Sequence, residues 1–357
     1  MLSPGQSQVL PRLKSNVPEL YSDPFGEGST APFCRDLHLL GAQFRFESNS
    51  SKLLRLVDSA YAGVPQQRLS RAVPHLRVRL ELTAAEHITS RAEPPPLQML
   101  SGAGLLGGAT QSSNFVVVSP QDRAALVAVS PRMMRFPYHT RYELIEFAVF
   151  TLAARAQKLV SMHGACVGLG DRGVLLMGPS GAGKSTVTLQ GLLEGLSFLS
   201  EDAVFVTPDT LLATGVPNFL HVRADSLKWV AVAAKIRKSP MIQRRSGVRK
   251  YEVDLRAGGY TLARQPLRIR SVVFLSARKA RPGQRLLVRL SRAQALRRLI
   301  AEQAYAAGQP TWAVFERNVG KLPCFELLRG QHPGESVAAI REILNSSSIA
   351  AGRTLDE

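Results

Sequence analysis

Near its middle the chain carries Gly178-Pro-Ser-Gly181-Ala-Gly183-Lys184-Ser185-Thr186, and this stretch decides the fold. It fits the pattern G-x-x-x-x-G-K-[ST], in which glycines let successive backbone N–H groups converge on one anion. The apolar run at 174–177 predicts a buried strand before it, and residues 186–193 are compatible with a helix after it. We therefore expect a phosphate-binding loop between a strand and a helix N-terminus. The alternative is a glycine-rich turn that binds nothing.

Phosphate chemistry predicts a role for each part of this stretch. The Lys184 ammonium would reach the β- and γ-phosphates of a nucleotide, and the Ser185 hydroxyl would bind Mg²⁺. The expected ligands are therefore ATP and Mg²⁺. The predicted phosphate-binding residues are Gly178, Pro179, Ser180, Gly181, Ala182, Gly183, Lys184, Ser185 and Thr186.

A phosphate loop needs acidic groups on a neighbouring strand before it can support a reaction. Glu201 and Asp202 follow the loop inside the run 198–206, which predicts a strand. One carboxylate could hold Mg²⁺, and the other could accept a proton from an attacking hydroxyl. Because side chains alternate along a strand, the two should point to opposite faces unless the strand ends there. The residues alone leave open whether one acid or both act.

His163 is a third candidate for the site. It lies just before a predicted strand, 21 residues ahead of Lys184. A lone histidine is often structural, and its spacing alone does not distinguish that role from catalysis.

Together, segments 161–164, 173–185 and 198–202 resemble the catalytic core of the HPr kinase/phosphorylase family. That family shares its nucleotide-binding core with ATP-dependent phosphoenolpyruvate carboxykinases, and the resemblance covers about residues 158–207. It implies an α/β fold, a P-loop kinase core of that type with a mixed sheet, and the use of ATP and Mg²⁺. It also implies that Glu201 is the general base on a substrate serine. Ser185 and Asp202 would bind the metal, and Lys184 and His163 would act in the active site.

The chain departs from this family at two places. The family has Asp where this chain has Glu201, whose carboxylate is one methylene further from the backbone. The family's E-R-G-x-G signature has no counterpart downstream, so the reverse, phosphorolytic reaction is not predicted. A basic segment at 237–250 occupies the corresponding region. Its candidates for closing over the phosphates or binding an acidic substrate are Arg244, Arg245, Arg249 and Lys250.

Composition restricts the class of protein. The 357 residues are 45% hydrophobic, as expected of a globular chain with a core. Cys34, Cys166 and Cys324 are too far apart and too few for a disulfide framework or a zinc site, which suits a reducing cytoplasm. We see neither a signal peptide nor an apolar stretch of about 18 residues, so we predict a cytoplasmic protein without a membrane span.

The net charge of +18 is concentrated in one part of the chain. Residues 235–298 contain 19 Lys and Arg residues against two acids. Such a segment should attract a nucleotide, an acidic protein or peptide, nucleic acid or anionic lipid, unless it is only a solvated basic face. Nucleic acid is disfavoured because few aromatic side chains are available there for base stacking, namely Tyr251, Tyr260 and Phe274.

The predicted organisation has three parts. Residues 1–112 form an N-terminal α+β region of unknown role, 113–350 an HPr kinase-like P-loop catalytic domain, and 351–357 a C-terminal tail. The segment 93–113, rich in Pro and Gly, is expected to be a linker or long loop. A β-hairpin at 114–129 is expected in the catalytic core or at its edge. Residues 140–157 predict an amphipathic helix capped by Thr140 and Glu143.

These observations predict an ATP- and Mg²⁺-dependent kinase that phosphorylates a serine of a small protein or peptide. Three alternatives remain open. The chain could be a nucleotide-gated binding protein with weak ATPase activity, a small-molecule kinase, or a nucleic-acid-binding protein that uses the basic segment. A homo-oligomer is compatible with each of them.

Overall fold

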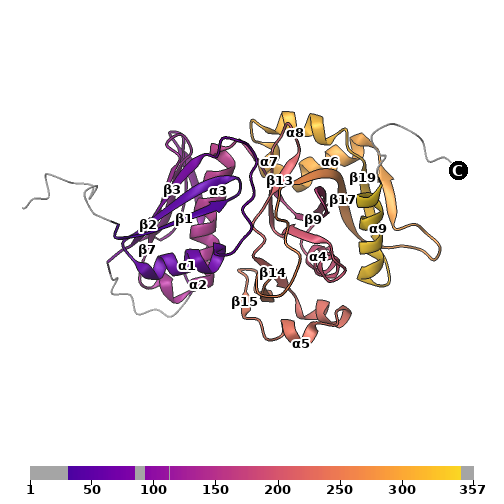
Figure 1. The fold of residues 1–357 in the computed structure, drawn as a ribbon, viewed down its shortest axis with the longest axis horizontal. Helices are drawn as coiled ribbons and strands as arrows, with labels where there is room; N and C mark the ends of the chain where they lie inside the picture. Colours follow the sequence, from indigo (N-terminus) through magenta and orange to yellow (C-terminus); the bar gives the residue numbers. More distant parts are fainter. Residues whose placement is uncertain (1–30, 85–92, 112, 347–357) are drawn as a thin grey trace, which may run out of the picture.

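The computed structural model of this chain describes residues 31–84, 93–111 and 113–346. Figure 1 shows two units side by side, with the N-terminal strands in one and the later strands in the other. Both contain mixed sheets with packed helices, so the predicted α/β class with a mixed sheet is confirmed. The finer assignment to a phosphoenolpyruvate carboxykinase-type core stays a prediction. The expected tail at 351–357 lies outside the described residues.

The N-terminal sheet has seven strands in the order β1-β2-β3-β7-β6-β5-β4. The pairs β2–β3 and β3–β7 are parallel, and the other pairs are antiparallel. The strands are β1 (Phe33–Leu39), β2 (Ala42–Ser48), β3 (His75–Leu82), β4 (Gln98–Gly102), β5 (Leu105–Gln111), β6 (Asn114–Ser119) and β7 (Ala124–Val129).

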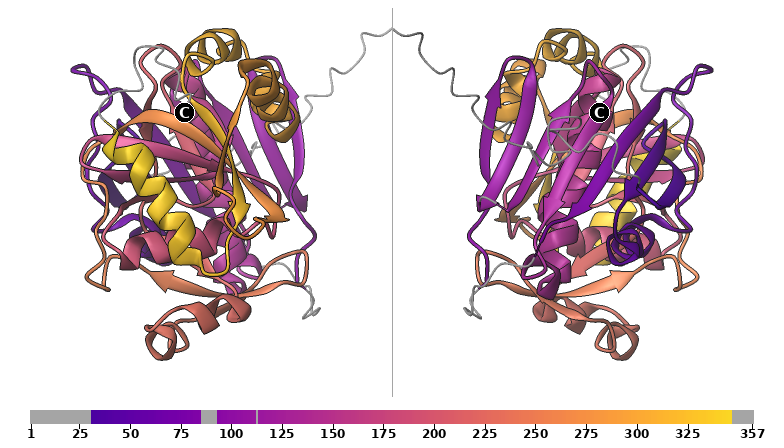
Figure 2. Two further views of the ribbon diagram at one scale, coloured as in Figure 1. Left: turned by 90° about the vertical axis from the view of Figure 1, so that its right-hand side faces the viewer. Right: turned by 90° about the vertical axis from the view of Figure 1, so that its left-hand side faces the viewer.

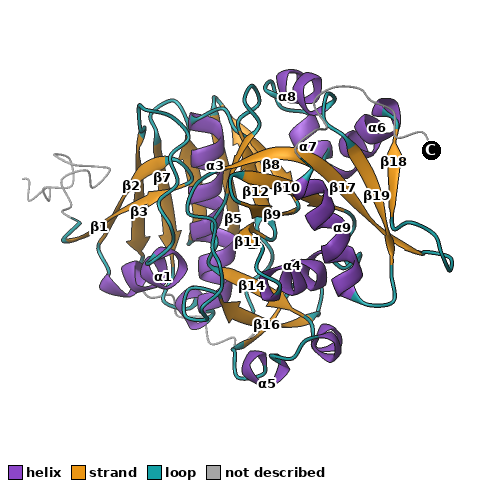
Figure 3. Cartoon of the chain, turned by 45° about the vertical axis from the view of Figure 1, so that its right-hand side comes forward, coloured by secondary structure: helices purple, strands orange, loops and turns teal. Residues whose placement is uncertain are grey.

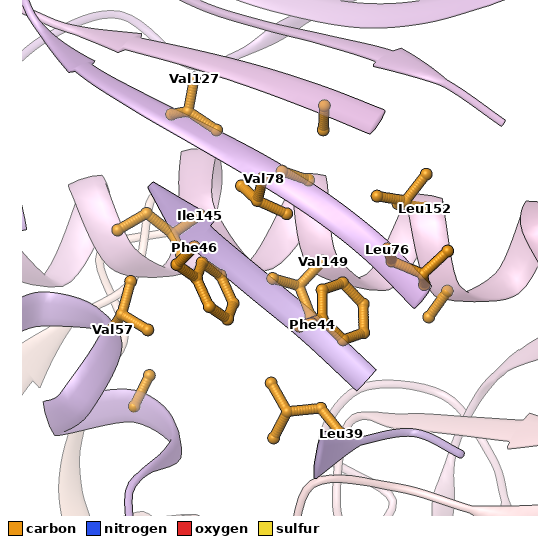
Figure 4. Packing of buried hydrophobic residues seen from close by; sticks show 14 of the residues in the cluster. Leu39, Phe44, Phe46, Val57, Leu76, Val78, Val127, Ile145, Val149 and Leu152 are labelled. Atoms are coloured by element: carbon orange, nitrogen blue, oxygen red, sulfur yellow. The ribbon is translucent and has the colours of Figure 1, made fainter. Parts of the chain in front are cut away.

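One face of this sheet is buried under two helices, α1 (Ser51–Tyr61) and α3 (Glu146–Ala156). The period-two pattern of β3 turns Leu76, Val78 and Leu80 into this core. Figure 4 shows Phe46 from β2 and Val149 from α3 in the same cluster, where both side chains are fully buried. The N-terminal unit is therefore a sheet with helices on one side.

Strands β6 and β7 carry this unit beyond the division expected between residues 112 and 113. They pair with β5 and β3, not with the sheet that holds the phosphate loop. Their inward side chains complete the apolar face that α3 covers, which is why they join this sheet. The expected division therefore cuts through the sheet, and much of the expected linker forms the hairpin β4–β5.

The second sheet has nine strands and carries the phosphate loop. Seven follow the order β11-β9-β10-β17-β13-β12-β8, and β19 and β18 continue from β17. The pairs β10–β17 and β17–β19 are parallel, and the others are antiparallel. The strands are β8 (Val160–His163), β9 (Ala165–Leu169), β10 (Arg172–Met177), β11 (Ser197–Ser200), β12 (Ala203–Val206), β13 (Leu212–Thr214), β17 (Leu267–Lys279), β18 (Leu287–Leu290) and β19 (Cys324–Arg329).

Helices cover both faces of this second sheet (Figure 3). Val174 and Leu176 of β10 face α9, whereas Leu175 and Met177 face the side of α6 and α8. Burial on both sides explains why 174–177 is a continuous apolar run and not an alternating one. The helices on the two faces are α4 (Lys184–Leu193), α6 (Arg292–Glu302), α7 (Ala304–Ala307), α8 (Trp312–Val319) and α9 (Pro333–Asn345).

A small third sheet lies beside α4 in the order β14-β16-β15. Figure 2 shows it with α5 at the end of the molecule, below α9 in the left-hand view. Its apolar side packs against Leu189 and Leu192 of α4. Its elements are β14 (Phe219–Val222), η4 (Ala224–Trp229), α5 (Ala233–Ile236), β15 (Met241–Gln243) and β16 (Arg249–Asp254).

The segment 133–156, which joins the two units, contains 3₁₀-, α- and π-helical turns. A 3₁₀ turn, η2 (Met133–Arg135), is followed by α2 (Pro137–His139), the π-helix η3 (Thr140–Ile145) and then α3. The predicted helix at 140–157 therefore begins earlier, and Thr140 does not cap it. The Thr140 hydroxyl donates to the carbonyls of Met133 and Phe136, at 2.8 and 3.1 Å, and not to a helix cap.

None of the helices in the described part of the chain is long and apolar enough to cross a bilayer. The cytoplasmic location stays a prediction.

Candidate active site

The phosphate loop lies where the sequence predicts it, between the end of β10 and the start of α4. The φ angles of Gly178, Gly181 and Gly183 are +140°, +85° and +104°, a region that L side chains rarely adopt. No described atom lies within 4 Å of a Cβ built on Gly181 or Gly183, so the loop is open on that side. The loop is therefore a glycine-dependent cradle at a helix N-terminus, as phosphate binding requires.

Lys184 and Ser185 open α4 and have partners within the site. The Lys184 ammonium donates to the Gly178 carbonyl at 2.6 Å. Burial lowers the pKa of Lys184, although Asp202 and Glu201 act in the opposite direction. The Ser185 hydroxyl donates to the Glu201 carboxylate. The loop and the first acid are thus already in contact.

Glu201 and Asp202 occupy the bend between β11 and β12. The run 198–206, predicted as one strand, is interrupted at these two residues. Because the chain turns here, the alternation that would have separated the two carboxylates does not apply. Both side chains line one cavity with Lys184 and Ser185.

The two acids have different partners. Glu201 is buried, and besides the Ser185 hydroxyl its carboxylate accepts the backbone N–H of His221 at 2.8 Å. Asp202 accepts from Arg244 at 2.6 Å and from the Tyr142 hydroxyl at 3.5 Å. Burial would raise the pKa of Asp202, but Arg244 and His221 lower it to about 2. Glu201 thus faces the loop, and Asp202 faces the basic hairpin.

Behind the acids lies a buried charge network that sequence reasoning missed. The Nε2 atom of His221, on β14, lies 3.2 Å from Glu252 Oε1 on β16, and Glu252 also accepts from Arg141 on η3. Burial lowers the pKa of His221, but hydrogen bonds to Glu201 and Glu252 offset this and raise it to about 8. The available signal was a histidine and a glutamate inside short apolar runs, where a buried polar group needs a partner.

The hairpin β15–β16 brings three of the four predicted basic residues to the cavity. Arg244, Arg245 and Lys250 line it, whereas Arg249 is exposed and is not among its lining residues. Arg245 donates to both carboxylate oxygens of Glu143 at 2.7 Å, which ties the hairpin to η3. The Arg244 guanidinium also lies 4.5 Å from the centre of the Tyr142 ring.

His163 ends β8 beside the acids, opposite Ala203 of β12. Its side chain is exposed and lines the cavity. Its backbone N–H and C=O are both bonded to the Gln303 side chain, at 2.8 and 2.9 Å. The side chain of Gln303 therefore holds the end of this edge strand in place, and the imidazole projects from a fixed backbone.

Two cavities meet at these residues. The larger, of about 1210 Å³, holds the phosphate loop and extends past Trp229 to the segments 279–284 and 327–333. That is ample volume for a nucleotide. The second, of about 440 Å³, lies toward α3 and β4. The residues that line both are Tyr142, Glu143, His163, Glu201 and Asp202.

The donor groups of this site fit Mg²⁺. Glu201, Asp202 and His221 offer ligand atoms that all lie within 4.8 Å of one another, and the Ser185 hydroxyl contacts Glu201. Carboxylate and hydroxyl oxygens are the ligands that Mg²⁺ prefers. The Nε2 atom of the His221 ring lies 3.2 Å from Glu252, and its Nδ1 atom lies 3.5 Å from Glu201 and 3.3 Å from a nitrogen of Arg244, so both ring nitrogens already have charged neighbours.

No family model and no curated protein matches this chain. Among solved structures, the chain is similar to the HPr(Ser) kinase/phosphatase from Coxiella burnetii, with 13% sequence identity and a TM-score of 0.26. The match covers 51% of this chain and 94% of that chain. A TM-score this low supports neither a common fold nor a common function, and the residues of the site must carry any functional assignment.

Proposed function

We propose that this chain is an ATP- and Mg²⁺-dependent kinase that transfers the γ-phosphoryl group of ATP to a serine hydroxyl of a small protein or peptide. One observation carries the proposal. Lys184 and Ser185 on the loop, and Glu201 and Asp202 on the facing bend, line a single cavity. A phosphate loop that only bound a nucleotide with Mg²⁺ would need one acid for the metal, whereas the second acid and the exposed histidine add groups that can orient an attacking hydroxyl.

The loop side binds the donor. Its amides and the N-terminus of α4 would hold the β- and γ-phosphates, and Lys184 would exchange the Gly178 carbonyl for a phosphate oxygen. Mg²⁺ bound by Ser185 and an acid would neutralise charge on the same phosphates. Arg244 stands on the other side, where its guanidinium could stabilise the transferring group.

The contacts favour an assignment of the two acids opposite to the one that the family resemblance implies. Glu201 bonds to the Ser185 hydroxyl, so it is the acid nearer to the metal position. Asp202 bonds instead to Tyr142 and Arg244, on the side where an acceptor hydroxyl would arrive, while its charge also acts on Lys184. We therefore assign Asp202 as the base that orients this hydroxyl, with His163 beside it.

In the transfer step, the bond between the γ-phosphorus and the β,γ-bridging oxygen breaks as a bond from the acceptor oxygen to that phosphorus forms. The hydroxyl proton passes to Asp202, and ADP leaves. Because the transition state is loose, positioning and charge neutralisation matter more than the strength of the base. This suits a carboxylate whose pKa is about 2.

The test is phosphoryl transfer from γ-labelled ATP by the Lys184→Ala variant. We expect a loss of about 10²–10³-fold in kcat with an unchanged circular dichroism spectrum, because a preorganised charge at the phosphates is removed. Lys52→Ala, an exposed lysine on α1, is the matched control and should behave as the unmodified chain. Unchanged transfer in Lys184→Ala, or label that appears only as free phosphate with every hydroxyl acceptor tried, would contradict the proposal.

A further inference from the structure

The smaller cavity gives the acceptor side of the site a definite shape. It meets the nucleotide cavity at Glu201, Asp202 and His163, and no residue of the phosphate loop is among the residues that line it. In-line transfer requires the attacking oxygen to approach from the side opposite to the leaving ADP. If the proposed kinase activity holds, the acceptor therefore approaches through this cavity.

The walls of this cavity are largely apolar away from the acids. Phe147 and Phe150 of α3 line one part, and Val216 and Phe219 line another. Beyond the acids and His163, the charged groups in its lining are Arg141, Glu143, Glu146 and His221, and each has a carboxylate or cationic partner within the network or the hairpin. Such walls suit an apolar segment that bears one hydroxyl, and they suit a multiply charged metabolite poorly.

Leu97 and Met99 of β4 also line this cavity, and because Met99 is largely exposed to solvent we place the mouth of the cavity there. Strand β4 is the last strand of the N-terminal sheet, and among the described strands it pairs only with β5. All five of its residues are exposed, including Met99 at 67% and Leu100 at 57%. Large apolar side chains on an exposed edge strand commonly mark a place where another chain pairs.

The register of the hairpin shows which backbone groups face outward. Gly102 pairs with Leu105 across the turn Ala103–Gly104, whose φ angles are +50° and +79°. In such a two-residue hairpin the closing pair is hydrogen-bonded, and bonded pairs then alternate along the strand. The N–H and C=O groups of Met99 and Ser101 therefore point away from β5, toward the open edge.

We propose that the acceptor is an extended polypeptide segment that pairs with the outer edge of β4 and places a serine side chain into the smaller cavity. Backbone pairing with Met99 and Ser101 would supply affinity without strict sequence preference, and the apolar mouth would select the neighbouring side chains. The open edge of β4 and the smaller cavity are continuous, because Met99 of β4 lines the same cavity as Glu201 and Asp202. A strand paired with this edge would therefore lie beside the acids.

The experiment compares phosphoryl transfer to peptides of about ten residues, each with a central serine flanked by apolar residues, with transfer to free serine and glycerol. The key variant is Met99→Pro, which removes an outward N–H but no hydrogen bond to β5. We expect KM for the best peptide to rise about tenfold, as the loss of a backbone hydrogen bond implies, with KM for ATP unchanged.

The matched control is Asp36→Pro on β1, the opposite edge strand of the same sheet. The hairpin β1–β2 is also closed by a two-residue turn, so Asp36 likewise points its N–H outward. It is exposed and remote from both cavities described above, and the peptide KM should not change. A rise in KM in Met99→Pro but not in Asp36→Pro supports docking on β4.

Other outcomes overturn the inference and separate it from the proposed function. Transfer to glycerol or free serine with none to peptides would contradict docking on β4, and so would an unchanged peptide KM in Met99→Pro. Neither result would contradict the proposed kinase activity. A dimer that dissociates in Met99→Pro at unchanged KM shows that the edge pairs with a second copy of this chain. No transfer to any hydroxyl sinks the proposed function itself.

Discussion

The two walls of the proposed active site are built in opposite ways. The part of the donor wall that faces the phosphates is continuous in sequence, because Gly178 to Thr186 supply its backbone and both of its reactive side chains. The acceptor wall is assembled from β4, η3, α3, β8, the β11–β12 bend, β14 and the β15–β16 hairpin. A triphosphate is chemically constant and can be held by backbone amides, whereas the acceptor must be selected by side chains. The acceptor wall can therefore change while the donor wall does not.

The largest expected effect separates the two acids. Asp202→Asn should lower kcat by about 10²–10⁴-fold with little change in the Mg²⁺ concentration needed for half-maximal activity, because it removes the base. Glu201→Gln should instead raise that Mg²⁺ concentration by about 10–100-fold, because it weakens the hold on Ser185 at the metal position. Initial rates measured over a range of Mg²⁺ concentrations give kcat and the Mg²⁺ requirement of each variant. Each amide variant serves as the control for the other.

The reverse pattern would break this division. Suppose that Glu201→Gln lowered kcat strongly and that Asp202→Asn changed only the Mg²⁺ concentration needed. Glu201 would then be the base and Asp202 a metal ligand, as the family resemblance implies. The contact between Ser185 and Glu201 would then be a feature of the nucleotide-free protein alone.

The second effect concerns Glu146, a buried carboxyl group beside the charge network behind the acceptor wall. Burial raises the pKa of Glu146 to about 7, although Arg141 and His221 oppose it. A carboxyl that binds its proton more tightly when folded contributes stability that is complete below its unfolded pKa of 4.5 and is lost as pH rises through 7. We expect Glu146→Gln to be more stable than the unmodified chain above neutral pH, by up to about 3 kcal/mol, and similar at about pH 4.

The measurement is urea denaturation of both proteins over this range of pH. The charged and titratable groups that act on Glu146 come from α1, α2, η3, β14, β16 and the β15–β16 hairpin. They are Tyr61, Tyr138, Arg141, Tyr142, His221, Arg244 and Glu252. His221 also loses stabilisation as pH rises from 6.5 through about 8, so only the difference between the two proteins reports on Glu146. A constant difference at all pH values would show that Glu146 does not titrate there.

The smallest effect concerns the joint between the third sheet and η3. Arg245→Ala should lower the free energy of unfolding by about 1 kcal/mol, because its two-pronged contact with Glu143 is partly shielded from water. Arg249→Ala, four residues further on and exposed, is the matched control and should change nothing measurable. Chemical denaturation measures both. Equal losses would mean that the joint contributes no more than an ordinary surface arginine.

The contrast between the walls also explains what the sequence could predict. The strand, loop and helix around Lys184 follow from a local pattern, and they lie where predicted. His221, Glu252 and Arg141 could not be found this way, because their meeting depends on the third sheet folding against η3. The division at residue 112 was misplaced for a related reason. Local alternation identifies β6 and β7 as strands, but only the apolar face of α3 decides which sheet they join.

The π-helix η3 has one more consequence. A π turn closes its hydrogen bonds one residue further along than an α turn, so it is equivalent to an α-helix that has gained a residue. Removing one residue from 143–145 would restore a regular helix and rotate the residues before the deletion by about 100° around its axis. Tyr142 would then leave the acids while Val149 kept its place in the core. One extra residue in this helical segment thus lets it pack against the N-terminal sheet and also bring Tyr142 to the acids.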